Sequence, residues 1–201
     1  MIKQLLAALS IATLYALPAH AAATAVDTGA PNGTAGLPLV VDGSDWVAAQ
    51  VSFANATTID AIAGHILGGA AGETFDISLF TGTPGQGPGA LLSTTTAIYG
   101  ASGWNGASGL GWAVAAGDYW IEFEIQGVDT LGGSSVTGAL FDVGVAHPVT
   151  TATTSDWGFT YDPSAQSIGL QVSTVPWPAS AALMLAGLGL LSAFGVARRA
   201  R

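Results

Sequence analysis

Apolar residues occupy every second position in four segments of the chain, which is the pattern of β-strands with one buried face. These apolar residues are Val47, Ala49, Val51 and Phe53, then Phe75, Ile77 and Leu79, then Tyr119, Ile121, Phe123 and Ile125, and finally Ile168, Leu170 and Val172. No helical period of apolar residues lasts beyond a turn or two in this part of the chain. The four segments therefore predict strands.

Six weaker strand candidates accompany them, at residues 38–42, 57–66, 91–99, 110–115, 137–145 and 156–161. Segments rich in turn-forming residues separate the candidates: Thr83–Gly89, Asn105-Gly106, Gly117-Asp118 and Gly132–Ser134. About eight to ten short antiparallel strands with one apolar face predict two sheets packed face to face. We expect an all-β antiparallel β-sandwich of jelly-roll type over residues 22–174, with a closed barrel as the alternative.

The first 21 residues have the parts of a secretory signal peptide. Lys3 supplies a positive start, Leu5–Leu17 is an apolar run, and Ala19-His20-Ala21 is a small-x-small cleavage site. The apolar run has 13 residues, which is short for a membrane span. We therefore expect cleavage after Ala21, the alternative being an N-terminal anchor helix.

The C-terminal region predicts a membrane-spanning helix. The 21 residues from Trp177 to Ala197 carry no charge, and as a helix they would extend about 31 Å, which matches the hydrocarbon core of a bilayer. Arg198, Arg199 and Arg201 follow directly. By the positive-inside rule these arginines stay in the cytoplasm, so the body of the protein lies outside the inner membrane.

The order of parts at this end resembles the C-terminal sorting signal of the PEP-CTERM class. Val175-Pro176-Trp177-Pro178-Ala179 is followed by the apolar stretch and then by the arginine cluster. Trp177 stands where the namesake motif has Glu, so the motif is closer to the Val-Pro-Leu-Pro-Ala variant. The resemblance implies a Gram-negative host, processing by an exosortase in the inner membrane, and a cell-surface or extracellular mature protein. A permanent single-span anchor is the alternative for residues 175–201.

A second resemblance concerns the body. Trp46–Phe53, Phe75–Thr81 leading into the Pro/Gly loop, and Ala115–Trp120 are similar to passenger domains found upstream of such tails. Those domains look like carbohydrate-binding sandwiches. This resemblance supports the sandwich fold and implies no particular ligand.

The distribution of charge excludes several functions. All thirteen acidic residues lie between Asp27 and Asp162, whereas the four basic residues lie near the two ends of the chain. The body therefore lacks the Lys and Arg side chains that neutralise nucleic-acid phosphates, and we expect no nucleic-acid binding. The chain has no Cys, which excludes disulfides, thiol catalysis and thiolate metal sites.

Nucleophilic catalysis finds little support. His65 and His147 are the only histidines of the body, and there is no Gly-x-Ser-x-Gly elbow or His-Glu-x-x-His motif. We interpret both histidines as structural and expect that the protein is not an enzyme.

Glu122 and Glu124 alternate with Trp120 on one face of a predicted strand, so the three side chains project together. Two carboxylates about 7 Å apart beside an aromatic ring suit a sugar- or cation-binding surface, or a glycosidase. The simpler interpretation is a solvated sheet face, because Tyr119, Ile121 and Phe123 form the opposite, core face.

Calcium is the one cofactor that the sequence raises. Asp42-Gly43-Ser44-Asp45 is a short acidic loop with oxygen ligands, and Ca²⁺ binds six to eight oxygens. The alternative is a turn in which Asp42 and Asp45 hydrogen-bond the backbone.

Three further tryptophans sit among Gly and Ser residues. Trp104 lies in Ser102–Gly106, which predicts a loop whose aromatic ring could stack on a sugar or fill the core. Trp112 and Trp157 are expected in the core.

Three functions follow from these observations. The first is a secreted, surface-sorted structural or adhesion protein of the extracellular matrix. The second is a carbohydrate-binding module that recognises an exopolysaccharide, and the third is a glycoside hydrolase using Glu122 and Glu124.

Overall fold

The structure is a computed structural model that describes residues 22–32, 39–41, 45–82, 87–124, 139–141, 143–155 and 158–176. These ranges form twelve β-strands: β1 (Ala23–Asp27), β2 (Leu39–Val41), β3 (Trp46–Phe53), β4 (Thr57–Leu67), β5 (Thr74–Gly82), β6 (Pro88–Ile98), β7 (Gly103–Val114), β8 (Gly117–Glu124), β9 (Ala139–Phe141), β10 (Thr151–Thr154), β11 (Asp162–Ser164) and β12 (Leu170–Pro176).

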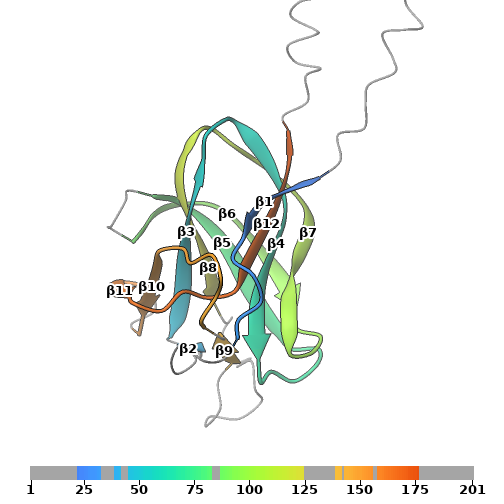
Figure 1. The fold of residues 1–201 in the computed structure, drawn as a ribbon, viewed down its shortest axis with the longest axis vertical. Coiled ribbons are helices and arrows are strands. Elements are labelled where there is room, and N and C mark those ends of the chain that lie inside the picture. Colours follow the sequence, from blue (N-terminus) through green and yellow to red (C-terminus); the bar gives the residue numbers. More distant parts are fainter. Residues whose placement is uncertain are drawn as a thin grey trace, which may run out of the picture. The chain divides into compact units, whose positions relative to one another are not determined.

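The strands form two antiparallel sheets (Figure 1). Sheet A has the order β1-β12-β4-β9-β2, with β7 also paired to β4, and sheet B has the order β11-β10-β3-β8-β5-β6. Four strand pairs are nested in the sequence: β2–β9, β3–β8, β4–β7 and β5–β6. A ribbon of nested antiparallel pairs wound around one core is the jelly-roll arrangement, so the predicted jelly-roll-like sandwich is confirmed.

One hydrophobic core lies between the sheets. The alternation predicted for β3, β5, β8 and β12 is confirmed, because their alternate apolar residues, among them Val47, Ile77, Ile121 and Val172, are fully buried together. Phe123 and Phe141 pack with ring centroids 4.9 Å apart. Gly64 of β4 makes room for them, since a Cβ there would lie 2.5 Å from Phe141 and 3.1 Å from Phe123.

One strand prediction and one loop prediction were wrong. The candidate at 156–161 is not a strand in its described part, since residues 158–161 form a turn between β10 and β11. The predicted loop at Ser102–Gly106 is instead the start of β7, which begins at Gly103. The Asn105 amide explains the second difference, because it accepts a hydrogen bond from the Gly100 N–H (2.9 Å) and donates to the Ala101 (2.7 Å) and Gly103 (3.0 Å) carbonyls. The Asn105 side chain supplies hydrogen-bond partners for the backbone of the preceding turn, so β7 can begin as early as Gly103.

The strands make up one compact unit, which runs from Ala22 to Val175. Its first and last strands pair antiparallel, with Ala23 opposite Thr174, and lie side by side in Figure 1. No helix in the described ranges is long and apolar enough to cross a membrane. The predicted signal peptide with Ala19 and Ala21, and the predicted spanning segment with Arg198, Arg199 and Arg201, lie outside the described residues.

Candidate functional site

The outer face of sheet B gathers acidic and aromatic side chains. In the antiparallel register, Glu124 of β8 lies opposite Asp76 of β5, and Glu122 lies opposite Ser78. On the other side of β8, Glu122 lies opposite Ala48 of β3. The prediction that Trp120, Glu122 and Glu124 share one face agrees with this register, because Tyr119, Ile121 and Phe123 point into the core.

The interpretation of this face as solvated was wrong. Glu122 is 0% exposed and Trp120 is 1% exposed, while Glu124 is half-buried. Trp120 belongs to a second small apolar cluster with Ala48 and Ala152, against which Phe80 and Tyr161 pack. The cover includes Tyr161 from the turn between β10 and β11, whose hydroxyl donates a hydrogen bond to Glu122 Oε1.

Burial changes the acidity of this carboxylate pair. Loss of hydration raises the pKa of Glu122 to about 7, and the negative charge of Glu124 adds to the rise, while the Tyr161 hydroxyl opposes it. The pKa of Glu124 is also raised by burial, against a hydrogen bond from the Ser78 hydroxyl (2.7 Å) and with repulsion from Asp76. The pair can therefore hold a proton near neutral pH.

Among the buried polar atoms of this face, Glu122 Oε2 and Trp120 Nε1 make no hydrogen bond in the part of the chain that the structure describes. A buried carboxylate oxygen without a donor favours the neutral acid over the carboxylate. Because neither residue is exposed, the Glu122 carboxyl group is covered in the structure, and this face presents no open carboxylate pair.

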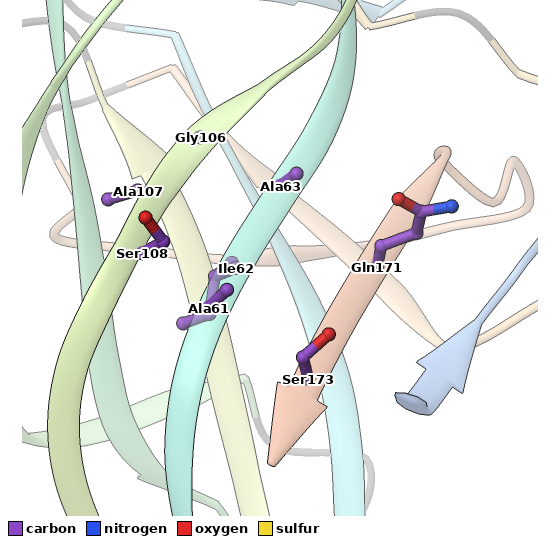
Figure 2. A pocket seen from close by; sticks show the side chains of 8 residues that line it. All are labelled: Ala61, Ile62, Ala63, Gly106, Ala107, Ser108, Gln171 and Ser173. Atoms are coloured by element: carbon purple, nitrogen blue, oxygen red, sulfur yellow. The ribbon is translucent and has the colours of Figure 1, made fainter. Parts of the chain in front are cut away.

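A shallow depression of about 250 Å³ lies on the outer face of sheet A (Figure 2). Its floor and one side consist of small residues of β4 and β7, including Ala61, Ala63, Gly106 and Ser108. Gln171 and Ser173 line it from β12. Its lining therefore offers hydroxyl and amide groups over a small apolar floor, and none of the lining residues is charged.

Trp104 extends this surface along the sheet. It lies opposite His65 in the β4–β7 register, two positions from the Ala63–Gly106 pair that lines the depression. Strand residues two positions apart share a face about 7 Å apart. Trp104 is half-buried and meets the His65 ring edge-on at 5.3 Å between centroids. An aromatic ring beside uncharged hydrogen-bonding groups is an arrangement that suits a sugar chain.

The other candidate residues lie elsewhere. Trp112 packs against the core, as expected, and Asp45 is half-buried, while Trp157, Asp42, Gly43 and Ser44 lie outside the described residues. No group of three or more His, Asp or Glu side chains in the described ranges could hold a metal ion. His147 is exposed and its backbone N–H donates to Thr28 (3.0 Å).

The predicted sorting motif begins within the last strand, β12. Val175 is half-buried at the end of β12, and its carbonyl accepts a hydrogen bond from the Thr57 hydroxyl (3.1 Å). Pro176 is the last residue of that strand, and Trp177 and Pro178 lie outside the described residues.

Sequence reasoning missed several residues of both surfaces. Gln171 and Ser173 could have been found, because they alternate with the buried Leu170 and Val172. Ser108 was hidden by the Gly-rich context of β7. Tyr161 carries no periodic signal, since it lies outside any strand.

No protein-family model matches this chain, and no curated protein is similar to it. The all-β, two-sheet antiparallel fold is therefore established from the structure alone, and no family is assigned.

Proposed function

We propose that this protein is a non-enzymatic structural or adhesion module of the extracellular matrix, exported with a signal peptide and sorted by its C-terminal tail. The observation that carries the proposal is the extent of the compact unit, Ala22–Val175. Its limits coincide with the cleavage site after Ala21 and with the start of the Val175–Pro178 motif.

The pairing of the two terminal strands supports removal of both ends. Ala23 lies opposite Thr174, and Thr57 holds the Val175 carbonyl. A cleavage after Ala21 and another next to Pro176 would leave β1 intact and nearly all of β12 within the mature chain. The sandwich would thus keep its first and last strands after processing.

An exosortase-type enzyme is the proposed processing partner, and the inner membrane holds the precursor until cleavage. The test is the intact mass of the protein recovered from its host, with and without the exosortase gene. The proposal expects a mass that corresponds to about residues 22–176 only where the enzyme is present. Recovery of a form that retains Arg198–Arg201 in both strains would overturn the sorting proposal and favour a permanent anchor.

Carbohydrate binding is a second candidate, which the surface around Trp104 favours. The residues that line the depression are uncharged, and the Asp27 carboxylate at its edge accepts a hydrogen bond from the Gln171 amide (3.5 Å), so this surface suits a neutral polysaccharide better than an anionic one. Trp104 would stack on a sugar ring, while Gln171 and Ser173 would hydrogen-bond its hydroxyls.

A glycan array followed by titration calorimetry tests this second candidate. Trp104→Ala should weaken binding at least about fivefold, because stacking on an aromatic ring contributes on the order of 1 kcal/mol or more. Phe159→Ala is the matched control, since Phe159 is an aromatic residue that is 84% exposed away from the depression. Equal losses from both variants, or no bound glycan, would reject the site.

A further inference from the structure

Strand β6 ends sheet B with an open hydrogen-bonding edge. It pairs with β5 on one side, and no described strand pairs with its other side. Its backbone direction can be derived from its end, where the Tyr99 N–H donates to Glu73 O (2.8 Å) and the Tyr99 carbonyl accepts from the Gly72 N–H (2.9 Å). Because these directions alternate along an antiparallel strand, the N–H and C=O groups of Thr94, Thr96 and Ile98 point away from β5.

This edge lacks the features that usually prevent strands of two molecules from pairing. Natural edges are protected by charged side chains, Pro or bulges. Here Pro88 and the register irregularities lie toward the start of β6, and the pairing with β5 is regular from Ser93 to Ile98. The 41 residues from Ile77 to Gly117, which include all of β6, contain no Asp, Glu, Lys, Arg or His. Asp76, the acidic residue opposite Thr96, is buried.

Exposed apolar side chains flank the regular part of the edge. Ile98 is 67% exposed and Leu92 is 48% exposed, whereas Ala97 and Tyr99 between the sheets are buried. Three of the four exposed large apolar residues found in the described ranges belong to this strand, the third being Leu91. Apolar area is thus concentrated next to unpaired backbone groups.

We infer that β6 pairs antiparallel with β6 of a second copy of this chain, joining two B sheets into one continuous sheet. A two-fold axis through Thr95 satisfies the geometry. It places Thr94 opposite Thr96 of the other copy, so that the outward-facing N–H and C=O groups of both residues meet. The same axis brings Leu92 of each copy beside Ile98 of the other.

A second copy fits this edge better than an unrelated strand. In the symmetric register the same residues of both copies form the hydrogen bonds on either side of the two-fold axis, which is the property of a self-complementary interface. Charge favours the same location: thirteen carboxylates make two copies repel, and the β6 edge lies within the uncharged segment of the chain. The inference adds a mode of assembly to the proposed structural role. Only the biological purpose of this assembly rests on the proposed function.

Disulfide trapping in the full-length chain tests the register, because the native sequence contains no Cys. At the two-fold axis the Thr95 pair is a non-hydrogen-bonded pair, whose Cα atoms are about 4.5 Å apart, within the range that a disulfide spans. Thr95→Cys should therefore form a disulfide-linked dimer on mild oxidation. Ile98→Cys is the matched control on the same strand. In this register the two copies of residue 98 are six positions apart, about 20 Å, so it should stay monomeric on the same gel.

A second variant tests the edge itself. Thr96→Pro in the Thr95→Cys chain removes an N–H that faces the edge and leaves the β5 hydrogen bonds in place, so the dimer should be lost while the melting temperature changes little. Thr96→Val, which keeps that N–H, should retain the dimer. Failure of Thr95→Cys to cross-link faster than Ile98→Cys, or a dimer that persists with Thr96→Pro, would overturn the inference. Either result leaves the processing proposal intact, because that proposal is judged by the mass of the secreted chain.

Discussion

The hydroxyl of Tyr161 donates a hydrogen bond to the carboxyl group of Glu122, which connects the turn after β10 to the middle of sheet B. Tyr161 also packs on the cluster of Trp120, Ala48 and Ala152. A Cβ on Gly158 would lie 2.9 Å from the Tyr161 hydroxyl oxygen and 2.7 Å from the Trp46 ring, so the turn fits closely over the sheet. The state of one buried acid is therefore coupled to the placement of this turn.

Stability should fall as the pH rises through the range in which Glu122 ionises. The pKa of Glu122 is about 7 in the folded protein and 4.5 as an unperturbed group. A raised pKa means that the folded state binds the proton more tightly, so its contribution is complete below about pH 4.5 and is lost by about pH 7. The loss amounts to about 3 kcal/mol at about 1.4 kcal/mol per pKa unit. Denaturant unfolding at pH 5 and pH 8 measures it.

Glu122→Gln should remove most of this difference and be more stable than the native protein at pH 8, because Gln stays neutral and still offers an oxygen to Tyr161. Asp162→Asn removes one exposed carboxylate and controls for the change in overall charge. An unchanged pH dependence in Glu122→Gln would show that another group is responsible.

The two faces of β8 differ in what they tolerate. Phe123→Asp should unfold the protein or cost at least about 4 kcal/mol, because it buries an unpaired charge between Phe75 and Phe141. Glu124→Gln should change the free energy of unfolding by less than about 1 kcal/mol, since the amide oxygen can still accept the Ser78 hydroxyl. Urea unfolding of both variants checks the expectation, and similar losses would contradict the orientation of the strand.

Gly64 should resist even the smallest side chain. Gly64→Ala places a methyl group against Phe141 and Phe123 in the core, and overpacking of this kind costs about 1–3 kcal/mol. Gly100→Ala is the control, because a Cβ there has its nearest neighbour, Asn105 Oδ1, at 3.8 Å. Thermal melts that show equal losses for both would mean that the aromatic pair can shift at no cost.

Salt should stabilise the protein. The thirteen acidic residues between Asp27 and Asp162 have no Lys or Arg among them, so their negative charges repel one another near neutral pH. Salt at 0.1 M screens interactions between charges more than about 10 Å apart. We expect the melting temperature to rise with sodium chloride. A larger rise in calcium chloride at equal ionic strength would support calcium binding at the Asp42–Asp45 loop, and identical curves would leave screening alone. A fall with sodium chloride would refute the repulsion argument.

The fold could be predicted from the sequence because one face of most strands packs on the core. Alternation in β3, β5 and β8 follows directly from that burial, so Phe53, Leu79 and Phe123 were assigned correctly. Alternation indicates which residues share a face of a strand. It does not indicate which other residues cover that face. The burial of Trp120 and Glu122 depends on β10 and Tyr161, which are distant in sequence and carry weak patterns of their own.

The surface around Trp104 was partly within reach of sequence reasoning. An aromatic ring in a Gly- and Ser-rich segment indicates a ligand candidate, but the same composition predicts a loop where the structure has the start of β7. Gly106 shows why composition misled: a Cβ there would lie 2.0 Å from the Ile62 carbonyl oxygen, so the glycine permits close approach of β7 to β4 inside the sheet. Residues that favour turns in isolation can thus be required by packing.

The pairing of β1 with β12 also governs when this protein can fold. The first strand of the domain finds its partner only in the last, nearly 150 residues later. The outer nested pair is also distant, with Leu39 of β2 opposite Phe141 of β9, whereas β5 and β6 follow each other in the chain. Because of the outer pairs, we expect a high contact order and slow folding. Sheet A cannot be completed until Leu170–Pro176 has emerged from the ribosome. An unfinished chain therefore lacks the strand that completes sheet A, and it cannot reach the native fold before residues 170–176 have been synthesised.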